Sequence, residues 1–232
     1  MTTTRMPPSP PIEPPATRVK FPDPRRAKGR DVLAVGNDFS AGTLLAAYRA
    51  GIFPWPHGSG VVPWCSPDPR AIFPLGGAEE PHWSRSLRRT LRNHPYGITI
   101  DRDFRGVMTA CGETRPEGTW IIPEMIDAYE ELHRLGWTHS LEVWDGDDLV
   151  GGIYGIAIGG AFAGESMFHT RTDASKIAFA SLVAHLRARG FVLYDVQVLT
   201  DHLESLGCIE VERIDYLGRL ARAITADVRF LP

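Results

Sequence analysis

The spacing of apolar residues divides the chain into a helical first half and a second half rich in strands. Leu44, Leu45 and Tyr48 recur at helical spacing, and Ser40 stands before them as a candidate N-cap. The same spacing predicts further helices at residues 85–93, 104–111 and 123–136. The segment 51–75 is instead dense in Pro, Gly and Trp, which is typical of turns.

From Ser140 onward the pattern changes to that of strands. Apolar and β-branched residues predict strands at 140–144, 149–158, 161–168 and 191–197. Asp145-Gly146 and Gly159-Gly160 are typical hairpin turns between the first three. We expect a long helix over 174–189, with Asp173 as its cap and Gly190 at its end, and a short helix over 201–207. This order predicts an α+β domain built on a mixed sheet with flanking helices.

Three regions follow from these patterns. Residues 96–232 form the predicted C-terminal domain, and residues 31–95 form a smaller N-terminal α+β domain. Residues 1–30 form a proline-rich arm, in which 8 of the 19 prolines lie before residue 25. Each proline removes a backbone donor and disfavours helix at the residue before it, so we expect the arm to be extended and mobile.

Composition narrows the function classes. The 232 residues are 43% hydrophobic and 23% charged, which excludes wholesale disorder, collagen and a pure coiled coil. The three cysteines are scattered without a CxxC pair, which favours the reducing cytoplasm. The most apolar stretch, 149–164, contains six glycines and is shorter than the ~20 residues of a membrane span. The N-terminus lacks the apolar run of a secretory signal, so we expect no membrane association.

Several common chemistries lack their motifs. There is no phosphate-binding GxxxxGK[ST] loop and no GxGxxG sequence, and the histidines are dispersed without HxH or HExxH spacing. Residues 164–168 read GESMF, where a serine-hydrolase elbow needs a second glycine in place of Phe168. We therefore predict neither a metal nor a nucleotide cofactor.

Polar residues at strand ends are the candidates for catalysis. Asp195 and Gln197 are two apart in the strand 191–197, so alternation predicts that they share a face. A carboxylate beside a carboxamide can orient an amine that attacks a carbonyl, although both residues could merely cap the next helix. Glu165 interrupts an apolar strand, which indicates either a buried arginine partner or a cationic ligand.

Two further groups of residues have a functional and a structural interpretation. Arg85, Arg88, Arg89 and Arg92 recur at helical spacing, so they form either a phosphate-binding stripe or a solvated helix face. Trp55, Trp64 and Trp120 lie in Pro- and Gly-rich surroundings, where large rings line pockets as well as cores.

Long segments of the chain resemble one family. From about Gly36 to Leu220 the chain resembles the bacterial leucyl/phenylalanyl-tRNA protein transferases. The resemblance is carried by YRAGIFPWP, PWCSPDPRAIFP, SRSLRR, EGTWI, HSLEVWDGDDLVGGIYGIAIGGAFAGESMFH, DASK and DVQVLTDHLESLG.

The resemblance implies an activity and a fold. The implied reaction is transfer of Leu or Phe, less readily Met, from aminoacyl-tRNA to proteins with N-terminal Arg or Lys, which marks them for degradation in the N-degron pathway. It implies no cofactor or metal, a monomer, and a C-terminal domain like the GCN5-related N-acetyltransferases. HTRTDASK replaces the acetyl-CoA loop of that fold, which argues against coenzyme A. The competing classes are an acetyl-CoA-dependent N-acetyltransferase and a non-catalytic binding module for tRNA or N-degrons.

Residue roles follow from the same resemblance. Asp195 and Gln197 match the pair that positions and helps to deprotonate the attacking amine, and Glu165 matches the acid at the acceptor's basic end. The positions around the aminoacyl-adenosine and its side-chain pocket are Trp55, Trp120, Tyr129 and Ile153, with Tyr48 near the same end. The arginine stripe is then expected to contact tRNA phosphates.

Charge is unevenly distributed between the arm and the rest of the chain. The formal net charge is -3, yet residues 1–30 hold seven basic and two acidic residues. The remaining 202 residues are therefore acidic, which suits a site that receives cationic N-termini. Binding of tRNA phosphates then requires only local basic patches and not a basic protein surface overall.

Overall fold

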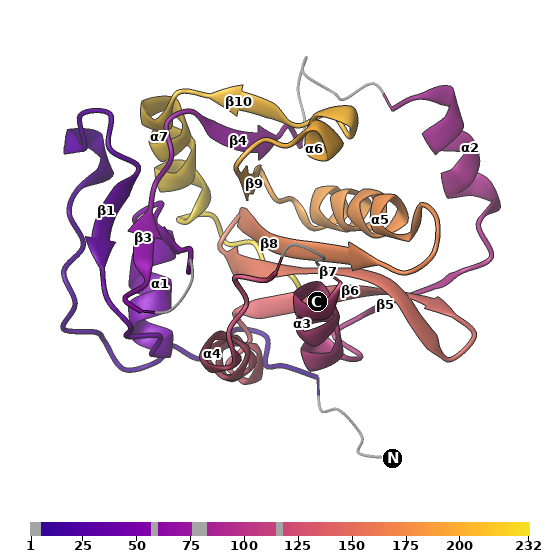
Figure 1. Cartoon of the computed structure of the whole chain (residues 1–232), viewed down its shortest axis with the longest axis horizontal. Helices are drawn as coiled ribbons and strands as arrows, with labels where there is room; N and C mark the ends of the chain where they lie inside the picture. The colour runs from indigo at the N-terminus through magenta and orange to yellow at the C-terminus, as the bar shows by residue number, and fades with distance from the viewer. Residues whose placement is uncertain (1–5, 57–59, 76–82, 115–117) are drawn as a thin grey trace.

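The computed structural model describes residues 6–56, 60–75, 83–114 and 118–232, which form a large mixed sheet with helices on both faces and a second, small sheet (Figure 1). The large sheet has the strand order β10 (Ile209–Val211), β4 (Arg70–Phe73), β9 (Leu193–Gln197), β8 (Ala161–His169), β7 (Asp148–Ile158), β6 (Thr138–Asp145), β5 (Gly97–Ile100). Within it, β8 and β9 pair in parallel and the other neighbours pair antiparallel. The α+β class with a mixed sheet is confirmed.

The small sheet comes from the turn-rich segment and its flank. It has the order β1 (Val32–Val35), β3 (Pro63–Cys65), β2 (Phe53–Pro54). The next strand, β4, leaves this sheet and inserts between β9 and β10 of the large one. Residues 70–73 therefore add a strand to the C-terminal sheet although they precede the predicted boundary at residue 95, which stays a prediction.

Helices cover the two faces of the large sheet (Figure 1). The chain contains α1 (Ala41–Arg49), α2 (Arg85–Asn93), α3 (Phe104–Glu113), α4 (Pro123–Arg134), α5 (Ala174–Arg189), α6 (Asp201–Ser205), α7 (Arg213–Ala223) and the short 3₁₀ helix η1 (Pro24–Arg26). Ile153 packs in the core beneath α5, whereas its neighbour Tyr154 packs in the core formed with α3 and α4. Alternation along β7 thus places successive side chains in two cores.

Several predicted boundaries are confirmed by the capping geometry. Ser84 accepts a hydrogen bond from Leu87 N at the start of α2 (3.1 Å), and Asp103 accepts one from Gly106 N at the start of α3 (2.9 Å). Gly190 ends α5 with a left-handed φ of 84°.

Three local predictions are wrong. Ser40 makes no side-chain cap bond at α1, because its hydroxyl donates to Thr43 Oγ1 instead (3.1 Å). Asp173 makes no side-chain cap bond at α5, because its carboxylate accepts hydrogen bonds from Lys176 and Thr90 instead. The turn between β6 and β7 consists of Gly146 and Asp147, one residue later than predicted, since Asp145 still pairs with Asp148. Gly146 takes the positive φ of 64° that this turn requires.

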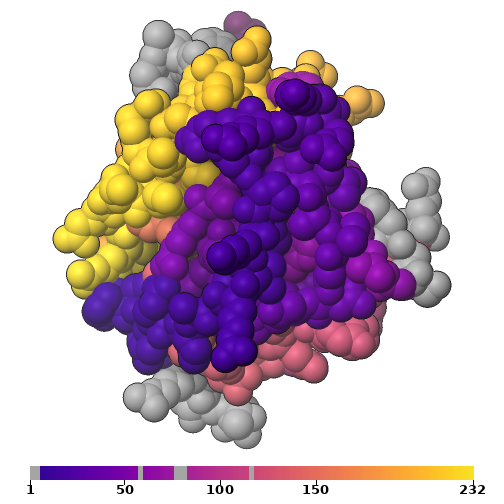
Figure 2. Space-filling model, turned by 90° about the vertical axis from the view of Figure 1, so that its left-hand side faces the viewer, coloured from indigo at the N-terminus to yellow at the C-terminus, as the bar shows by residue number. Residues whose placement is uncertain are grey.

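Apart from the short 3₁₀ helix η1, the described part of the proline-rich arm is extended and lies along the body. Ile12 N donates to Leu135 O (2.7 Å), and Trp137 Nε1 donates to Ile12 O (2.8 Å). Arg49 forms two hydrogen bonds with Glu13 (2.6 and 2.8 Å). Figure 2 shows these N-terminal residues in indigo, laid over the surface beside the C-terminal residues in yellow.

Among the described residues, every helix is too short or too polar to cross a membrane.

Candidate active site

The candidate site opens where the parallel strands β8 and β9 separate. Their ladder runs from Ala161 beside Leu193 to Ala163 beside Asp195 and then ends. Beyond it lies a cavity of about 230 Å³. Gly164 to Met167 of β8 line one side of this cavity, and Val196 to Val198 line the other. Divergence of two paired strands therefore creates the space, and the strand ends supply its polar groups.

Most of the predicted pocket residues meet in this cavity. Trp55, Trp120 and Ile153 line it together with Glu165 and Gln197. Trp64, the third tryptophan of the predicted set, is instead 2% exposed in the core and donates from Nε1 to Gly36 O (3.0 Å).

Sequence reasoning missed other residues of the wall, among them Tyr194, Met167 and His202. Tyr194 and Met167 add to the apolar lining, and His202 of α6 stands at one side. Gly164 is required beside Tyr194, because a Cβ at this position would lie 2.9 Å from Cε2 of that ring. The sequence shows Gly164, but it does not show that the ring of Tyr194, on another strand, packs against this glycine.

Glu165 is held at the base of the cavity by neutral hydrogen-bond donors. Its side chain is 8% exposed, and Gln197 Nε2 donates to its Oε1 (2.8 Å). The Tyr129 hydroxyl donates to its Oε2 (3.3 Å) and is itself 2.5 Å from the Tyr48 hydroxyl. Burial raises the pKa of Glu165 to about 7, although hydrogen bonds from Tyr48 and Tyr129 act to lower it. This carboxyl group can change its charge near neutral pH.

Asp195 faces away from the cavity and has many partners. Arg70 donates from Nε to Oδ1 (2.8 Å) and from Nη2 to Oδ2 (2.6 Å). The Tyr216 hydroxyl donates to Oδ2 (2.8 Å), and Gln197 N donates to Oδ1 (2.9 Å). Asp195 lines a separate void of about 10 Å³. Its role in this geometry is to fix the backbone of Gln197.

The predicted common face for Asp195 and Gln197 is wrong. Gln197 has a φ of 67°, which breaks the alternation of β9 and turns its side chain toward Glu165. The capping alternative is wrong as well, because Thr200 caps α6 by accepting from Leu203 N (3.2 Å).

Arg70 is the principal residue that sequence reasoning missed. It opens β4 with 1% exposure, donates to Gly51 O (3.3 Å), and lies over the rings of Phe53 and Tyr216. Burial is the largest single effect and lowers the pKa of Arg70, but the charge and hydrogen bonds of Asp195 together with the neighbouring tyrosines raise this pKa above its usual value overall. The buried arginine is therefore the hydrogen-bonded partner of Asp195, whereas Glu165 is held by Gln197 and Tyr129.

The predicted arginine stripe lies on the exposed face of α2. Leu87 is the buried residue of this helix, while all four arginines are exposed: Arg85, Arg88, Arg89 and Arg92. Thr90 Oγ1 donates to Asp173 at the start of α5 (3.3 Å). The structure therefore keeps the stripe beside the α5 N-terminus.

A second, open cavity of about 570 Å³ lies at that end of α5. His169, Arg171 and Lys176 line it together with His202, which also lines the first cavity. Basic side chains thus extend from the edge of the candidate site toward α2.

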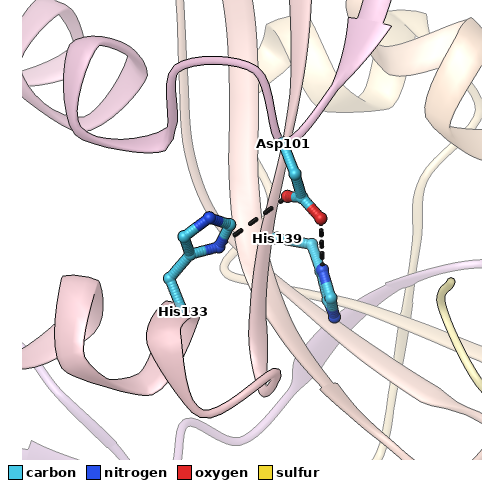
Figure 3. Close-up of side chains that lie close together, drawn as sticks. All are labelled: Asp101, His133 and His139. Atoms are coloured by element: carbon cyan, nitrogen blue, oxygen red, sulfur yellow. Dashed lines mark hydrogen bonds and ion pairs between the residues drawn. The ribbon is translucent and has the colours of Figure 1, made fainter. Parts of the chain in front are cut away.

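One histidine cluster has ligand types that bind metals. Among the described residues, Asp101, His133 and His139 bring ligand atoms within 4.8 Å of one another (Figure 3). Asp101 accepts from His139 Nδ1 (2.8 Å) and Ser140 N (2.8 Å), and His133 Nδ1 faces Thr138 O (2.7 Å). The Asp101 oxygens and His133 Nδ1 thus have hydrogen-bond partners on β6, so the cluster acts as a structural network that joins α4 and the segment after β5 to β6. The spacing of these three residues in the sequence matches no metal-binding motif, so the sequence did not predict the cluster.

Sequence comparison relates the chain to one family. The profile described as leucyl/phenylalanyl-tRNA protein transferase matches residues 76–221, and its N-terminal domain profile matches residues 37–68. A leucyl/phenylalanyl-tRNA–protein transferase of Anaeromyxobacter sp. (strain Fw109-5) is 50% identical over 209 residues, covering 89% of this chain and 88% of the relative. The protein of the same name from Shewanella baltica (strain OS155) is 48% identical over 205 residues, covering 87% and 85%.

Solved structures give weaker likenesses. A GCN5-related N-acetyltransferase-like protein from Streptococcus suis is 14% identical with a TM-score of 0.34, covering 61% of this chain and 58% of that one. A functionally unknown conserved protein from Staphylococcus epidermidis is 10% identical with a TM-score of 0.43, covering 78% and 68%. Both TM-scores are below 0.5, so the fold rests on the strand order and helix placement described above.

Proposed function

The chain belongs to the leucyl/phenylalanyl-tRNA protein transferase family and is an aminoacyl-tRNA-dependent aminoacyltransferase, from which we propose that it transfers Leu or Phe, less readily Met, to proteins with N-terminal Arg or Lys. The observation that carries this proposal is the cavity where β8 and β9 separate, which combines an aromatic wall with the Glu165–Gln197 pair. An aminoacyl ester is already activated, so the enzyme must chiefly hold two substrates in one orientation.

The aminoacyl-adenosine end of the tRNA occupies the apolar side of the cavity. Trp55 and Trp120 offer ring faces for the adenine base, and Ile153 with Met167 offers apolar surface for a Leu or Phe side chain. Tyr48 and Tyr129 lie behind the cavity wall. The Tyr48 hydroxyl is hydrogen-bonded to that of Tyr129, which donates to Glu165.

The acceptor's N-terminus enters at the polar side. Glu165 receives the cationic end of the acceptor, and the Gln197 carboxamide orients the attacking amine. Asp195 keeps Gln197 in place by accepting its backbone N–H while Arg70 and Tyr216 anchor the carboxylate. The excess of acidic residues after residue 30 favours the approach of positively charged N-termini.

The body of the tRNA lies toward α2. The second cavity, with Arg171 and Lys176, borders the first through His202, and Thr90 links α2 to the same end of α5. Arg85, Arg88, Arg89 and Arg92 would then contact backbone phosphates without reading bases. In the cell, this transfer would mark acceptors for degradation in the cytoplasm, with the enzyme acting as a monomer.

A transfer assay tests the proposal. Radiolabelled leucyl-tRNA is incubated with the protein and a model acceptor that begins with Arg, and label in the acceptor is measured. We expect label in this acceptor and no label in an acceptor whose N-terminus is acetylated. Binding of leucyl-tRNA without transfer would support a non-catalytic module, and acetylation of the acceptor with acetyl-CoA would support an N-acetyltransferase; either result contradicts the proposal.

A further inference from the structure

Two buried carboxylates lie near the diverging strand ends, and the geometry assigns them different roles. We propose that Glu165 takes the proton from the acceptor's α-ammonium group, and that Asp195 is a positioning residue that does not exchange protons during transfer. This inference rests on the proposed function, and it identifies the cation that Glu165 meets as the reacting ammonium itself.

Asp195 is unsuitable as the proton acceptor because its oxygens are already occupied. A carboxylate offers about four lone-pair positions. Arg70 fills two of them, the Tyr216 hydroxyl a third, and Gln197 N a fourth. Asp195 is also 2% exposed and lines the void of about 10 Å³ rather than the larger cavity. An incoming amine would have to displace a buried ion pair to reach it.

Glu165 has the position that Asp195 lacks. It lines the large cavity, and Gln197 Nε2 binds its Oε1 at 2.8 Å. The Tyr129 hydroxyl donates to Oε2, and the Tyr48 hydroxyl is hydrogen-bonded to that of Tyr129. Two neutral donors, Gln197 and Tyr129, leave lone-pair positions on the carboxylate for the ammonium. Gln197 then touches both the carboxylate and the cavity, so one amine can be oriented by Gln197 and deprotonated by Glu165.

The charges around Glu165 suit proton exchange near neutral pH. Tyr48 of α1 and Tyr129 of α4 approach it as neutral hydroxyls, while the opposite charges of Asp195 and Arg70 lie behind it on β9 and β4. His202 of α6 lines the cavity on another side. Burial is the main reason that the pKa of Glu165 is about 7, close to the ~8 of a peptide α-amine. Donor and acceptor with similar pKa values exchange a proton readily.

The proposed step balances in atoms and charge. The α-ammonium gives one proton to the Glu165 carboxylate, and the freed lone pair attacks the ester carbonyl of the aminoacyl-tRNA. The new C–N bond forms, the bond from the carbonyl carbon to the terminal ribose oxygen breaks, and that oxygen takes a second proton from the amine. Glu165 returns its proton to water once the product leaves.

Single-turnover kinetics of Glu165→Gln test this assignment. The substitution keeps the shape of the side chain and offers a carbonyl oxygen to Gln197, so the variant should fold. An unchanged affinity for aminoacyl-tRNA would confirm that it does. Transfer from bound leucyl-tRNA is timed between about pH 6 and 9, a range that spans the ionisation of both groups, with acceptor peptides beginning with Arg or with its neutral isostere citrulline. The wild-type rate should rise through an inflection near the pKa of Glu165, about 7.

We expect Glu165→Gln to slow transfer at pH 7 by about 10²-fold, a typical loss for a general base, and to remove this inflection. The defect should shrink toward pH 9, where the amine is deprotonated without help. Loss should be equal for the Arg and citrulline acceptors. An unchanged inflection, or a loss confined to the Arg acceptor, would overturn the assignment while leaving the transferase function intact.

A second variant tests the same claim without touching Glu165. Tyr48→Phe with Tyr129→Phe removes hydrogen bonds that lower the pKa of Glu165, so the inflection should move to higher pH. Asp195→Asn serves as the comparison, and it should slow transfer while keeping an inflection. An inflection that vanishes in Asp195→Asn and is unmoved in the tyrosine variant would overturn the assignment. If the wild-type chain transfers nothing, the proposed function itself fails.

Discussion

The ion pair between Arg70 and Asp195 gives a sharp prediction about stability. The two side chains are 1% and 3% exposed and are joined by two hydrogen bonds. Replacing Arg70 with Met keeps most of the volume but leaves the Asp195 carboxylate buried without its cation. Breaking a buried pair in this way costs about 3–5 kcal/mol. In a chain of this size, each kcal/mol lowers Tm by about 2–4 °C.

Arg70→Met should therefore lower Tm by about 6–20 °C. Arg105→Met is the matched control, because Arg105 also contacts two carboxylates, those of Asp127 and Glu130, but lies 51% exposed on the surface. We expect the control to leave the free energy of unfolding nearly unchanged, since water replaces an exposed partner at little cost.

Thermal unfolding gives the Tm of both variants, and urea unfolding followed by tryptophan fluorescence gives their free energies of unfolding. Asp195→Asn completes a double-mutant cycle. Adding Asp195→Asn to Arg70→Met removes the unpaired charge and should restore part of the lost stability. A loss of stability in Arg70→Met no greater than that in Arg105→Met, or a double variant less stable than Arg70→Met alone, would show that the buried pair does not stabilise the fold in this way.

Two further predictions concern turnover and tRNA binding. Asp195→Ala should lower the transfer rate far more than the affinity for aminoacyl-tRNA, because Gln197 loses its backbone anchor while the apolar wall remains; equal loss in both quantities would reduce Asp195 to a general structural role. Replacing Arg88 and Arg89 together with Gln should reduce the slope of log affinity against log salt by about 2, and an unchanged slope in tRNA-binding titrations would return α2 to a solvated helix face.

Local patterns in the sequence predicted the long elements well. Helix α5 and the strands β6 to β8 carry strong periodicity, and the turn at Gly159-Gly160 is confirmed between β7 and β8. The short strands β4 and β10 gave no such signal, because three or four residues cannot establish alternation. Their place in the sheet depends on pairing with β9 and with each other, which is long-range information.

The candidate site divides in the same way. Glu165, Gln197 and the two tryptophans stood out as residue types that were unusual for their surroundings, and the structure brings them to one cavity. The partner of Asp195 was hidden, since Arg70 is 125 residues away in sequence. The positive φ of Gln197 was equally invisible, because strand periodicity predicts an ordinary side-chain direction at that position. Sequence therefore supplied the reactive groups, and tertiary contacts decided which of them face the substrate.

Transfer of an amino acid from tRNA to a basic N-terminus increases the mass of the acceptor protein, and mass spectrometry detects this increase. Acceptor proteins that differ only in their first residue, Arg, Lys or Ala, are incubated with the enzyme and leucyl-tRNA. The mass of each acceptor is then measured. The Arg and Lys acceptors should each gain one leucyl residue on the α-amine, while the Ala acceptor should stay unchanged. Unmodified Arg and Lys acceptors, or equal modification of all three, would contradict the proposed transfer.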